Sequence, residues 1–379
     1  DYPYAYVRWT EQRNMESFLE LVRAGRVTPS KLVTHRFPVA EALKAYELLE
    51  KGAEPYLGIL LEYPAKDGQK PSRAVEVRSL QQKGRTGIGF VGAGNFAKGV
   101  LLPALKKSPG IDLICICTAT GMSASETAKK FGFGVATTDY ESLLTDERIN
   151  TVFIATRHES HARLACAALS RGKHVFVEKP LCVKPAQIDD YRKAIEKAGP
   201  NTCLMVGFNR RFSPHALSIQ KAFSDRHSPM VVNYRVNAGM IPKETWVQDS
   251  REGGGRIIGE VCHFVDFCEF LTGSEVVQVA AASIQCQDSR ITPEDSTVVT
   301  LRYADGSLAT IQYVAVGSPD LPKERVEVYA DGAVAVLEDF VETRFFGRPE
   351  KRIRTRQDKG FTGEVNAFLG AIQNGGAWP

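Results

Sequence analysis

The fold of this chain is decided by residues 86–97, which read TGIGFVGAGNFA. The first six residues are an apolar run typical of a buried strand, and the rest matches G-x-G-x-x-A at the start of a predicted helix. The first glycine permits a tight turn, and the second lets the backbone approach a pyrophosphate at the helix N-terminus. We therefore predict a dinucleotide site at Gly92, Ala93, Gly94, Asn95 and Phe96.

Apolar runs alternate with amphipathic stretches on both sides of this turn, from about Thr86 to Val206. The runs are residues 87–91, 113–117, 152–155, 175–177 and 203–206. Continuous apolar runs suit strands that are covered on both faces, so their alternation with helices predicts a parallel, doubly wound sheet. We expect an α/β fold with a Rossmann dinucleotide-binding domain at residues 85–207.

The pattern changes after Gly207. Two predicted helices are followed by six strand candidates, at residues 276–284, 296–303, 308–316, 325–330, 333–337 and 343–346. Tight turns such as ADGS at residues 304–307 join these strands, and strands joined by tight turns pair antiparallel. Residues 208–379 are therefore predicted to form an α+β domain with a large, mostly antiparallel open sheet.

The bulk composition narrows the classes of partner. The formal net charge is +4, the chain has no dense block of Lys and Arg, and no apolar run is long enough to span a bilayer. The eight cysteines include no C-x-x-C pair, which favours buried free thiols in a reducing compartment, and zinc has no visible ligand set. We expect a cytoplasmic protein that binds no metal, nucleic acid or membrane.

The end of the second strand bears on the choice of cofactor. A carboxylate about 20 residues after the glycine turn would bind the ribose 2′-hydroxyl of NAD. Here Cys117 is followed by Thr118-Ala119-Thr120-Gly121, with neither an acid nor an arginine that would attract the 2′-phosphate of NADP. Thr118 is a predicted cofactor contact, and the choice between NAD and NADP stays open.

A lysine follows a later strand at the same edge of the predicted sheet. Residues 175–177 run into Glu178-Lys179-Pro180, and the segment ATRHESH at residues 155–161 follows the preceding strand. Ligands bind at the carboxyl ends of parallel strands, so side chains at these positions face the binding crevice. Five of them are predicted to contact the cofactor: Thr156, Arg157, His161, Glu178 and Lys179.

A family resemblance is carried by four segments: residues 92–97, residues 156–161, GKHVFVEKP at residues 172–180 and GFNRRF at residues 207–212. Together they resemble the Gfo/Idh/MocA family, which contains glucose–fructose oxidoreductases, inositol dehydrogenases and related sugar dehydrogenases. The resemblance covers roughly Arg85 to the C-terminus. It implies hydride transfer between nicotinamide and a sugar or polyol carbon, with Lys179 stabilising negative charge on the reacting oxygen.

The second catalytic segment of that family has the form G-G-x-x-x-D-x-G-x-H. Residues 254–263 read GGRIIGEVCH, so His263 stands at the catalytic histidine and Gly259 at the aspartate. Glu260 follows one place later and would share a helix face with His263, so it could assist. An unperturbed imidazole pKa of about 6.5 suits His263 to take the proton of a substrate hydroxyl. The resemblance thus implies that Lys179, His263 and Glu260 are catalytic.

Five further residues are predicted to contact the substrate: Asn209, Arg211, Arg235, Trp246 and Asp266. The aromatic ring of Trp246 stands among polar groups, which suits the apolar face and hydroxyl edge of a sugar. Asp266, at i+3 from His263, either orients the imidazole or caps a solvated face. A structural salt bridge is an equal alternative for Arg211.

Residues 1–65 differ in character from the rest. They contain two helix patterns and two strand-like runs, at residues 15–24, 39–51, 31–37 and 56–62. These segments are similar to the C-terminal end of a medium-chain zinc alcohol dehydrogenase, which implies the remnant of a first enzyme in a two-enzyme fusion. The charged residues 66–84, which include Pro71, suit a linker.

The resulting hypothesis is an NAD(P)-dependent dehydrogenase or reductase of a sugar, a sugar derivative or a cyclitol. By analogy with the family, we expect a homodimer or homotetramer formed through the exposed face of the large sheet. Three alternatives stay open: a non-catalytic module that binds cofactor or sugar, an interaction scaffold, and an enzyme that uses bound NAD transiently for elimination, epimerisation or glycoside cleavage. The shifted acid at Glu260 favours the first of these.

Overall fold

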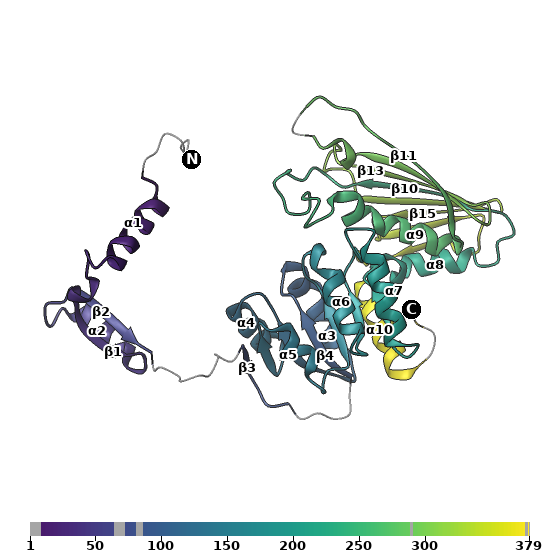
Figure 1. Ribbon diagram of the computed structural model, residues 1–379. Coiled ribbons are helices and arrows are strands. Elements are labelled where there is room, and N and C mark those ends of the chain that lie inside the picture. The colour runs from purple at the N-terminus through teal and green to yellow at the C-terminus, as the bar shows by residue number, and fades with distance from the viewer. Residues whose placement is uncertain (1–8, 64–72, 81–85, 289–290, 376–377, 379) are drawn as a thin grey trace. The chain divides into compact units, whose positions relative to one another are not determined.

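The structure is a computed structural model that describes residues 9–63, 73–80, 86–288, 291–375 and 378 (Figure 1). The chain divides into two compact units, Asp1–Pro71 and Ser72–Pro379, and each is described by itself below. No helix in the described ranges is both long and apolar enough to cross a membrane.

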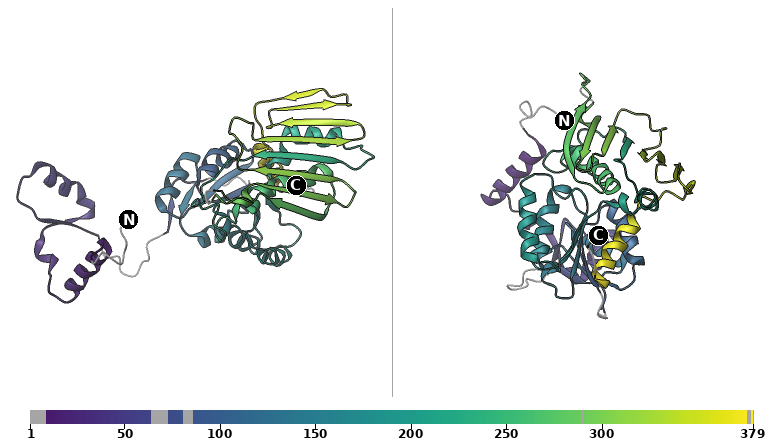
Figure 2. Two further views of the ribbon diagram at one scale, coloured as in Figure 1. Left: turned by 90° about the horizontal axis from the view of Figure 1, so that it is seen from above. Right: turned by 90° about the vertical axis from the view of Figure 1, so that its right-hand side faces the viewer.

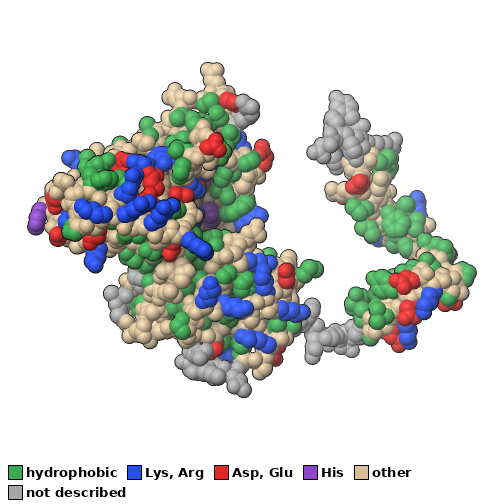
Figure 3. Space-filling view, turned by 180° about the vertical axis from the view of Figure 1, so that it is seen from behind, with side chains coloured by type: hydrophobic (Ala, Val, Ile, Leu, Met, Phe, Trp, Pro, Cys, Tyr) green, Lys and Arg blue, Asp and Glu red, His purple; other side chains and the backbone are tan. Residues whose placement is uncertain are grey.

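The first unit contains a parallel strand pair. Its helices and strands are α1 (Glu11–Arg23), a 3-10 turn (Pro29–Leu32), β1 (Val33–Pro38), a 3-10 turn (Val39–Glu41), α2 (Ala42–Lys51) and β2 (Gly58–Glu62). These agree with the four predicted elements, and α2 makes the crossover between β1 and β2. Only Ala45 and Leu48 are buried apolar residues in the described part of this unit, and hydrophobic side chains cover much of its surface (Figure 3).

The second unit begins with a seven-stranded sheet of order β3-β6-β5-β4-β7-β8-β9. The strands are β3 (Ala74–Glu76), β4 (Thr86–Val91), β5 (Ile111–Cys117), β6 (Val135–Thr137), β7 (Thr151–Ile154), β8 (His174–Val177) and β9 (Leu204–Val206). All pairs are parallel except β3 with β6, which confirms the predicted doubly wound sheet.

One strand of this sheet lies where a linker was predicted. β3 falls within residues 66–84 and pairs antiparallel with β6 at the edge of the sheet. A strand of three residues, Ala74-Val75-Glu76, is too short to show the alternation on which strand prediction depends. The linker prediction is therefore wrong for these residues.

Helices cover both faces of the first sheet. They are α3 (Leu102–Lys107), α4 (Gly121–Phe131), α5 (Tyr140–Thr145), α6 (His161–Leu169) and α7 (Gln187–Ala198). Neighbours in a strand point to opposite faces, so Phe90, Phe153 and Phe176 pack against α3 and α4 while the valines beside them pack against α5, α6 and α7. The three phenylalanines are cross-strand partners whose rings stack in a ladder, with centroids 6.2 and 4.9 Å apart.

The remaining strands form an eight-stranded sheet of order β11-β12-β13-β10-β14-β15-β16-β17 (Figure 2). They are β10 (Val231–Asn237), β11 (Val276–Ser283), β12 (Thr297–Tyr303), β13 (Leu308–Val314), β14 (Glu324–Ala330), β15 (Ala333–Glu338), β16 (Glu342–Phe346) and β17 (Arg352–Arg354). Every pair is antiparallel except β10 with β13, so the predicted open sheet is confirmed. α8 (Pro214–Ala222) and α9 (Cys262–Thr272) cover one face, while outward residues of β12 stay exposed.

The last helix, α10 (Phe361–Asn374), returns to the first sheet (Figure 1). Its Phe368 contacts Phe153 and Phe176, with ring centroids 5.5 and 5.7 Å away. The predicted substrate domain, residues 208–379, therefore ends in a helix that belongs to the core of the dinucleotide-binding domain. The consequence for the site is that α10 adds a ring, Phe361, to the cavity described next.

Candidate active site

A cavity of about 840 Å³ lies between the carboxyl ends of the first sheet and the second domain. The turns after β4, β5, β7 and β8 contribute one wall, and residues on both sides of the start of α9 contribute the other. Every predicted cofactor residue lines this cavity, as do the three predicted catalytic residues, Lys179, Glu260 and His263.

The glycine turn after β4 fits a dinucleotide. Gly92 has a φ of +103°, and a Cβ there would lie 2.2 Å from the carbonyl oxygen of Ala155, so no other residue fits. A Cβ on Gly94 would meet nothing within 4 Å, which leaves the backbone open to a ligand on the cavity side. Lys98 N donates to Gly94 O at 3.0 Å and closes the first helical turn, which continues into a short π-helix (Ala97–Leu101). The backbone amides at the start of this turn suit a pyrophosphate.

The end of β5 contributes uncharged groups. The hydroxyl of buried Thr118 donates to the carbonyl oxygen of Thr120 at 2.7 Å, and its backbone N–H donates to Thr137 O at 3.1 Å. Ala119, Thr120 and Ser123 complete this end of the cavity. The turn is therefore ordered by its own backbone and offers no charge to a ribose.

The segment after β7 holds three of the predicted cofactor residues. Thr156 bonds Ser160 through their hydroxyl oxygens, 2.6 Å apart, and Arg157 forms an ion pair with Glu252 of the second domain. His161 places one ring nitrogen 2.8 Å from Pro180 O and the other 3.1 Å from Thr156 O. A neutral imidazole has one N–H and a carbonyl can only accept, so the ring donates to one of these two carbonyls. His161 also lines the cavity, and its contact with the cofactor stays a prediction.

Glu178 follows β8 directly and has a buried carboxyl group. Gly207 leaves room for it, because a Cβ on that glycine would lie 3.0 Å from Glu178 Oε1. Burial raises the pKa of Glu178 to about 7, although the charge of Lys179 and a hydrogen bond from the Lys179 backbone N–H act to lower it. Glu178 Oε1 has no hydrogen-bond partner in the described part of the chain.

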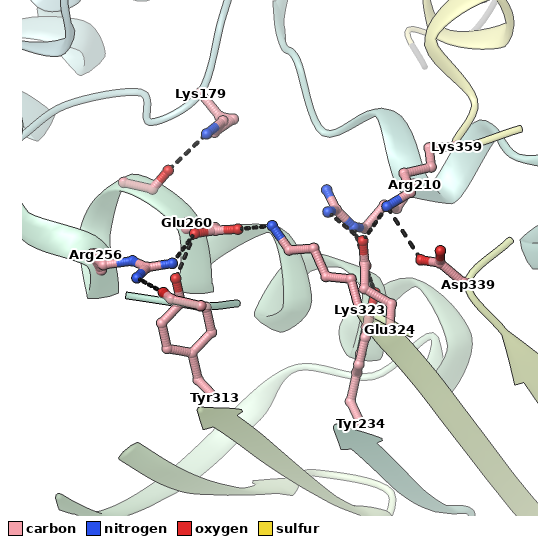
Figure 4. Close-up of polar contacts among 12 residues, drawn as sticks. Lys179, Arg210, Tyr234, Arg256, Glu260, Tyr313, Lys323, Glu324, Asp339 and Lys359 are labelled. Carbon is pink, nitrogen blue, oxygen red and sulfur yellow. Dashed lines mark hydrogen bonds and ion pairs between the residues drawn. The ribbon is translucent and has the colours of Figure 1, made fainter. Parts of the chain in front are cut away.

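Lys179 crosses from the first domain to the second. Its Nζ donates to the carbonyl oxygen of Gly259, 2.7 Å away, in the short π-helix (Ile257–Val261) that precedes α9 (Figure 4). The side chain is half-buried and lines the cavity. A carbonyl accepts the hydrogen bond without neutralising the ammonium charge, so the cation stays available at the cavity wall.

His263 lies in the first turn of α9 with its ring buried. Burial holds the pKa of its imidazole well below the usual range, and the positive charges of Arg210, Lys179, Lys323 and Lys359 act in the same direction. Nδ1 has no hydrogen-bond partner among the residues that the structure describes. The ring is therefore a neutral imidazole beside the same cavity as the ammonium group of Lys179.

Comparison with known proteins agrees with this geometry. Residues 86–208 match the model of the oxidoreductase family with an NAD-binding Rossmann fold, and residues 228–336 match the model of the GFO/IDH/MocA C-terminal domain. Together the two matches cover more than half of the chain. The chain belongs to the Gfo/Idh/MocA family.

Individual relatives are distant. Inositol 2-dehydrogenase of Rhizobium meliloti (strain 1021) is 28% identical over 300 residues, which cover 76% of this chain and 89% of that protein. Levoglucosan dehydrogenase of Pseudarthrobacter phenanthrenivorans is 31% identical over 167 residues, 42% of each chain. Among solved structures, levoglucosan dehydrogenase in complex with NADH and levoglucosan has a TM-score of 0.66 at 22% identity, covering 77% of this chain and 90% of that one. At this identity the structural likeness establishes the fold alone.

Glu260, the acid that departs from the family pattern, is held in an ionic network (Figure 4). Its carboxylate accepts from Lys323 at 2.6 Å, from Arg256 at 3.1 Å and from the Tyr313 hydroxyl. Burial alone would raise the pKa of Glu260, but the charge and hydrogen bond of Lys323, with smaller contributions from Tyr313 and Arg256, lower it to about 2. This carboxylate therefore stays ionised and bonds Lys323, Arg256 and Tyr313, and its predicted assistance to His263 stays a prediction.

A second network lies beside it and surrounds Glu324. Arg210 donates two parallel hydrogen bonds to this fully buried carboxylate, at 2.7 and 2.9 Å, and Lys359 and Tyr234 add bonds of 2.7 and 2.6 Å (Figure 4). Arg210 also lines the cavity. Lys359 also forms an ion pair with Asp339, and the positive charges of Arg210 and Lys359 both lower the pKa of His263.

The predicted substrate residues divide into two groups. Trp246 and Asn209 line the cavity, and buried Asn209 Oδ1 has no partner in the described ranges. Arg211 and Asp266 form an ion pair with each other outside the cavity lining, so the structural alternative holds for Arg211. Arg235 lies on β10 and donates to Pro322 O at 2.7 Å. Predicting Arg211, Asp266 and Arg235 as substrate contacts was therefore wrong, since nearby groups already satisfy them away from the cavity.

Several cavity residues were not predicted, among them His158, Arg210, Ile241 and Phe361. His158 stands within the segment ATRHESH at residues 155–161, so its position at the sheet edge was a signal for it. Phe361 carried no such signal, because it comes from the far end of the chain through the return of α10. Long-range packing of this kind leaves no local pattern.

Proposed function

We propose that the chain is an NAD-dependent dehydrogenase that interconverts a hydroxyl and a carbonyl group on a sugar, a sugar derivative or a cyclitol. One observation carries the proposal: an ammonium group and a neutral imidazole line the cavity that the glycine turn opens into. The names of the relatives, inositol 2-dehydrogenase and levoglucosan dehydrogenase, support the substrate class.

The cofactor would be held by the turn after β4. Gly92 and Gly94 admit the pyrophosphate, and uncharged Thr118 and Thr120 stand where a ribose would lie, which supports NAD over its 2′-phosphorylated form. When bound, the nicotinamide ring would exchange a hydride with the carbinol carbon of the substrate. The residues of the chain supply binding, orientation and proton transfer.

Lys179 would stabilise the reacting oxygen. An ammonium group has three N–H donors, and Gly259 O takes one of them, which also fixes the direction of the side chain. The remaining donors can reach an oxygen in the cavity. As the carbon is oxidised, the negative charge that develops on this oxygen strengthens the interaction, which lowers the barrier and not only the energy of the bound substrate.

His263 would take the hydroxyl proton. A ring with a lowered pKa is unprotonated at neutral pH and so has a free lone pair to accept the proton. The surrounding cations disfavour the protonated ring, so His263 would pass the proton on to water after hydride transfer. In the direction of reduction, the same ring would return a proton to the oxygen.

A panel of sugars, polyols and cyclitols with NAD and with NADP tests the proposal. The wild type should reduce NAD with at least one member, and Lys179→Ala should lower kcat/KM by about 100-fold or more, as expected for loss of one charge-stabilising donor. NADH affinity, measured by fluorescence, should stay within a few-fold. Turnover in Lys179→Ala equal to the wild type would refute the assignment.

The outer face of the eight-stranded sheet supports an assembly of two copies. Cross-strand pairing aligns an apolar row over five strands: Leu308, Val231, Tyr329, Val334 and Phe346. Four of these side chains are exposed, and contiguous exposed apolar surface marks an interaction site. We propose that a second copy of the chain covers this row.

A cytoplasmic location depends on the cysteine pattern alone and stays a prediction.

We further propose that the first unit is the C-terminal part of a medium-chain dehydrogenase-like domain. The parallel β1–α2–β2 crossover and exposed side chains such as Leu43, Tyr46 and Leu57 support a surface that packs on more protein. A medium-chain dehydrogenase that lacks its own C-terminal segment should then bind the full chain and slow amide exchange in residues 9–63. Failure to bind would contradict this origin.

A further inference from the structure

His158 is a buried cavity residue to which the proposed mechanism gives no part. It begins the 3-10 turn (His158–Ser160) after β7 and lines the same cavity as Lys179 and Trp246. Its exposed fraction is 8%, so the ring is held in place by packing.

The hydrogen bonding of His158 fixes its tautomer. Nδ1 lies 2.7 Å from the carbonyl oxygen of Gly253, and a carbonyl can only accept, so Nδ1 carries the proton. Burial lowers the pKa of His158 to about 4, and the charge of Lys179 acts in the same direction, so the ring is neutral near pH 7. Nε2 then has a free lone pair, and no described residue bonds to it.

The second domain is shaped around this ring. The edge of the Trp246 ring packs against it, with centroids 4.8 Å apart. A Cβ at position 259 would lie 3.1 Å from His158 Cε1 and 3.5 Å from Nδ1, so only glycine gives the imidazole its full space. A Cβ at position 253 would lie 2.3 Å from the carbonyl oxygen of Val247, so this position also requires glycine. The carbonyl oxygen of Gly253 is the one that bonds His158 Nδ1.

Gly259 joins this ring to the proposed reactive centre. Its carbonyl oxygen accepts from Lys179 Nζ at 2.7 Å, while its Cα faces the His158 ring. The ammonium group of Lys179, a donor, and the ring of His158, whose Nε2 is an acceptor, therefore both lie against one residue of the cavity wall. Two neighbouring hydroxyl groups of a sugar ring match such a pair, because one accepts at the reacting oxygen and the other donates.

We propose that His158 is a specificity-determining residue whose Nε2 accepts a hydrogen bond from the substrate hydroxyl next to the oxidised carbon. The inference rests on the proposed function and narrows the substrate class to polyhydroxylated rings with a free hydroxyl at that position. A deoxy or O-methyl analogue leaves the buried acceptor unpaired, which is costly.

The test compares a polyol substrate from the panel with its analogue deoxygenated next to the oxidised carbon. Binding of both to the enzyme–NADH complex is measured by calorimetry, in which no turnover occurs, and kcat/KM is measured separately. In the wild type the polyol should bind about 10- to 100-fold more tightly than the analogue, the range expected for an unpaired buried acceptor. His158→Phe keeps a ring without the acceptor and should reduce this ratio to about one.

Two further variants make the test selective. His158→Gln, whose amide oxygen can accept, should retain part of the preference, while His227→Phe, at an exposed site, should retain all of it. An unchanged preference in a folded His158→Phe that binds NADH normally would overturn the proposal. If His158→Phe does not fold, the proposal is also overturned when His158→Gln binds the polyol no more tightly than the deoxy analogue. If the wild type binds no polyol at all, it is the proposed function that fails.

Discussion

The ammonium nitrogen of Lys179 lies 2.7 Å from the carbonyl oxygen of Gly259, and this bond joins the first sheet to the helix that carries His263. The partner of the lysine is a neutral carbonyl, not a carboxylate. The carboxylate that follows, Glu260, is occupied by Lys323, Arg256 and Tyr313 (Figure 4). The positive charge of Lys179 therefore faces the cavity without a counter-ion from this turn.

Glu260→Gln should act mainly on stability. The substitution leaves Lys323 and Arg256 without their anion. Loss of one partner from a buried ion pair lowers the free energy of unfolding by about 3 kcal/mol, and the loss here should be somewhat smaller because Lys323 is partly exposed. Urea denaturation measures this loss. The matched control is Glu47→Gln, whose pair with Lys51 is exposed and should contribute below about 0.5 kcal/mol. Equal losses in both variants would contradict the importance of the network.

Glu178→Gln should change how stability depends on pH. Burial raises the pKa of Glu178 to about 7, above the value of about 4.3 in an unfolded chain. The folded state then holds a proton that the unfolded state releases, so this acid destabilises the fold progressively as the pH rises from about 4 to 7. The amide variant should gain stability relative to the wild type over that window, as followed by urea denaturation. A constant difference from pH 4 to 8 would show that folding does not shift the pKa of this carboxyl.

Alanine substitutions at the two glycines of the dinucleotide turn should have different effects on stability and on NADH affinity. Gly92→Ala puts a Cβ 2.2 Å from Ala155 O at a φ of +103°, so both thermal stability and NADH affinity should fall. Gly94→Ala meets nothing within 4 Å in the protein and should lower NADH affinity at unchanged stability. Calorimetric melting and NADH titration separate the two. Normal NADH affinity in Gly94→Ala would mean that the cofactor does not approach this backbone.

The apolar row on the outer face of the sheet predicts a self-associating surface. Val231→Glu places a charge within the row, between Leu308 and Tyr329, and should lower the mass measured by light scattering to that of a single chain. Thr300→Glu changes an exposed residue of β12 outside the row and should leave the mass unchanged. A wild type that is already a single chain at micromolar concentration would remove the basis for this surface.

Sequence reasoning located the site through backbone rules. The turn at Gly92 and the position of Lys179 both follow from where parallel strands end, and those rules need no knowledge of distant contacts. His263 was found through a spaced motif, and the cavity contains it. The parallel first sheet and the mostly antiparallel second sheet followed from the alternation of elements and from turn chemistry.

The errors come from pairings between side chains that local pattern does not encode. Arg211 and Asp266 are 55 positions apart and satisfy each other. The return of α10, which brings Phe361 to the cavity, likewise depends on packing over the whole length of the domain.

The most direct measurement is the single-turnover rate of NADH formation, by stopped flow, for Lys179→Met, His263→Ala and the double variant. Groups that act on one substrate oxygen work as a unit, so their losses are not additive. Each single variant should be slowed by about 100-fold or more, and the double variant should be scarcely slower than the worse single one. If the two losses multiply in the double variant, or either single variant reacts as fast as the wild type, Lys179 and His263 do not act together on the substrate.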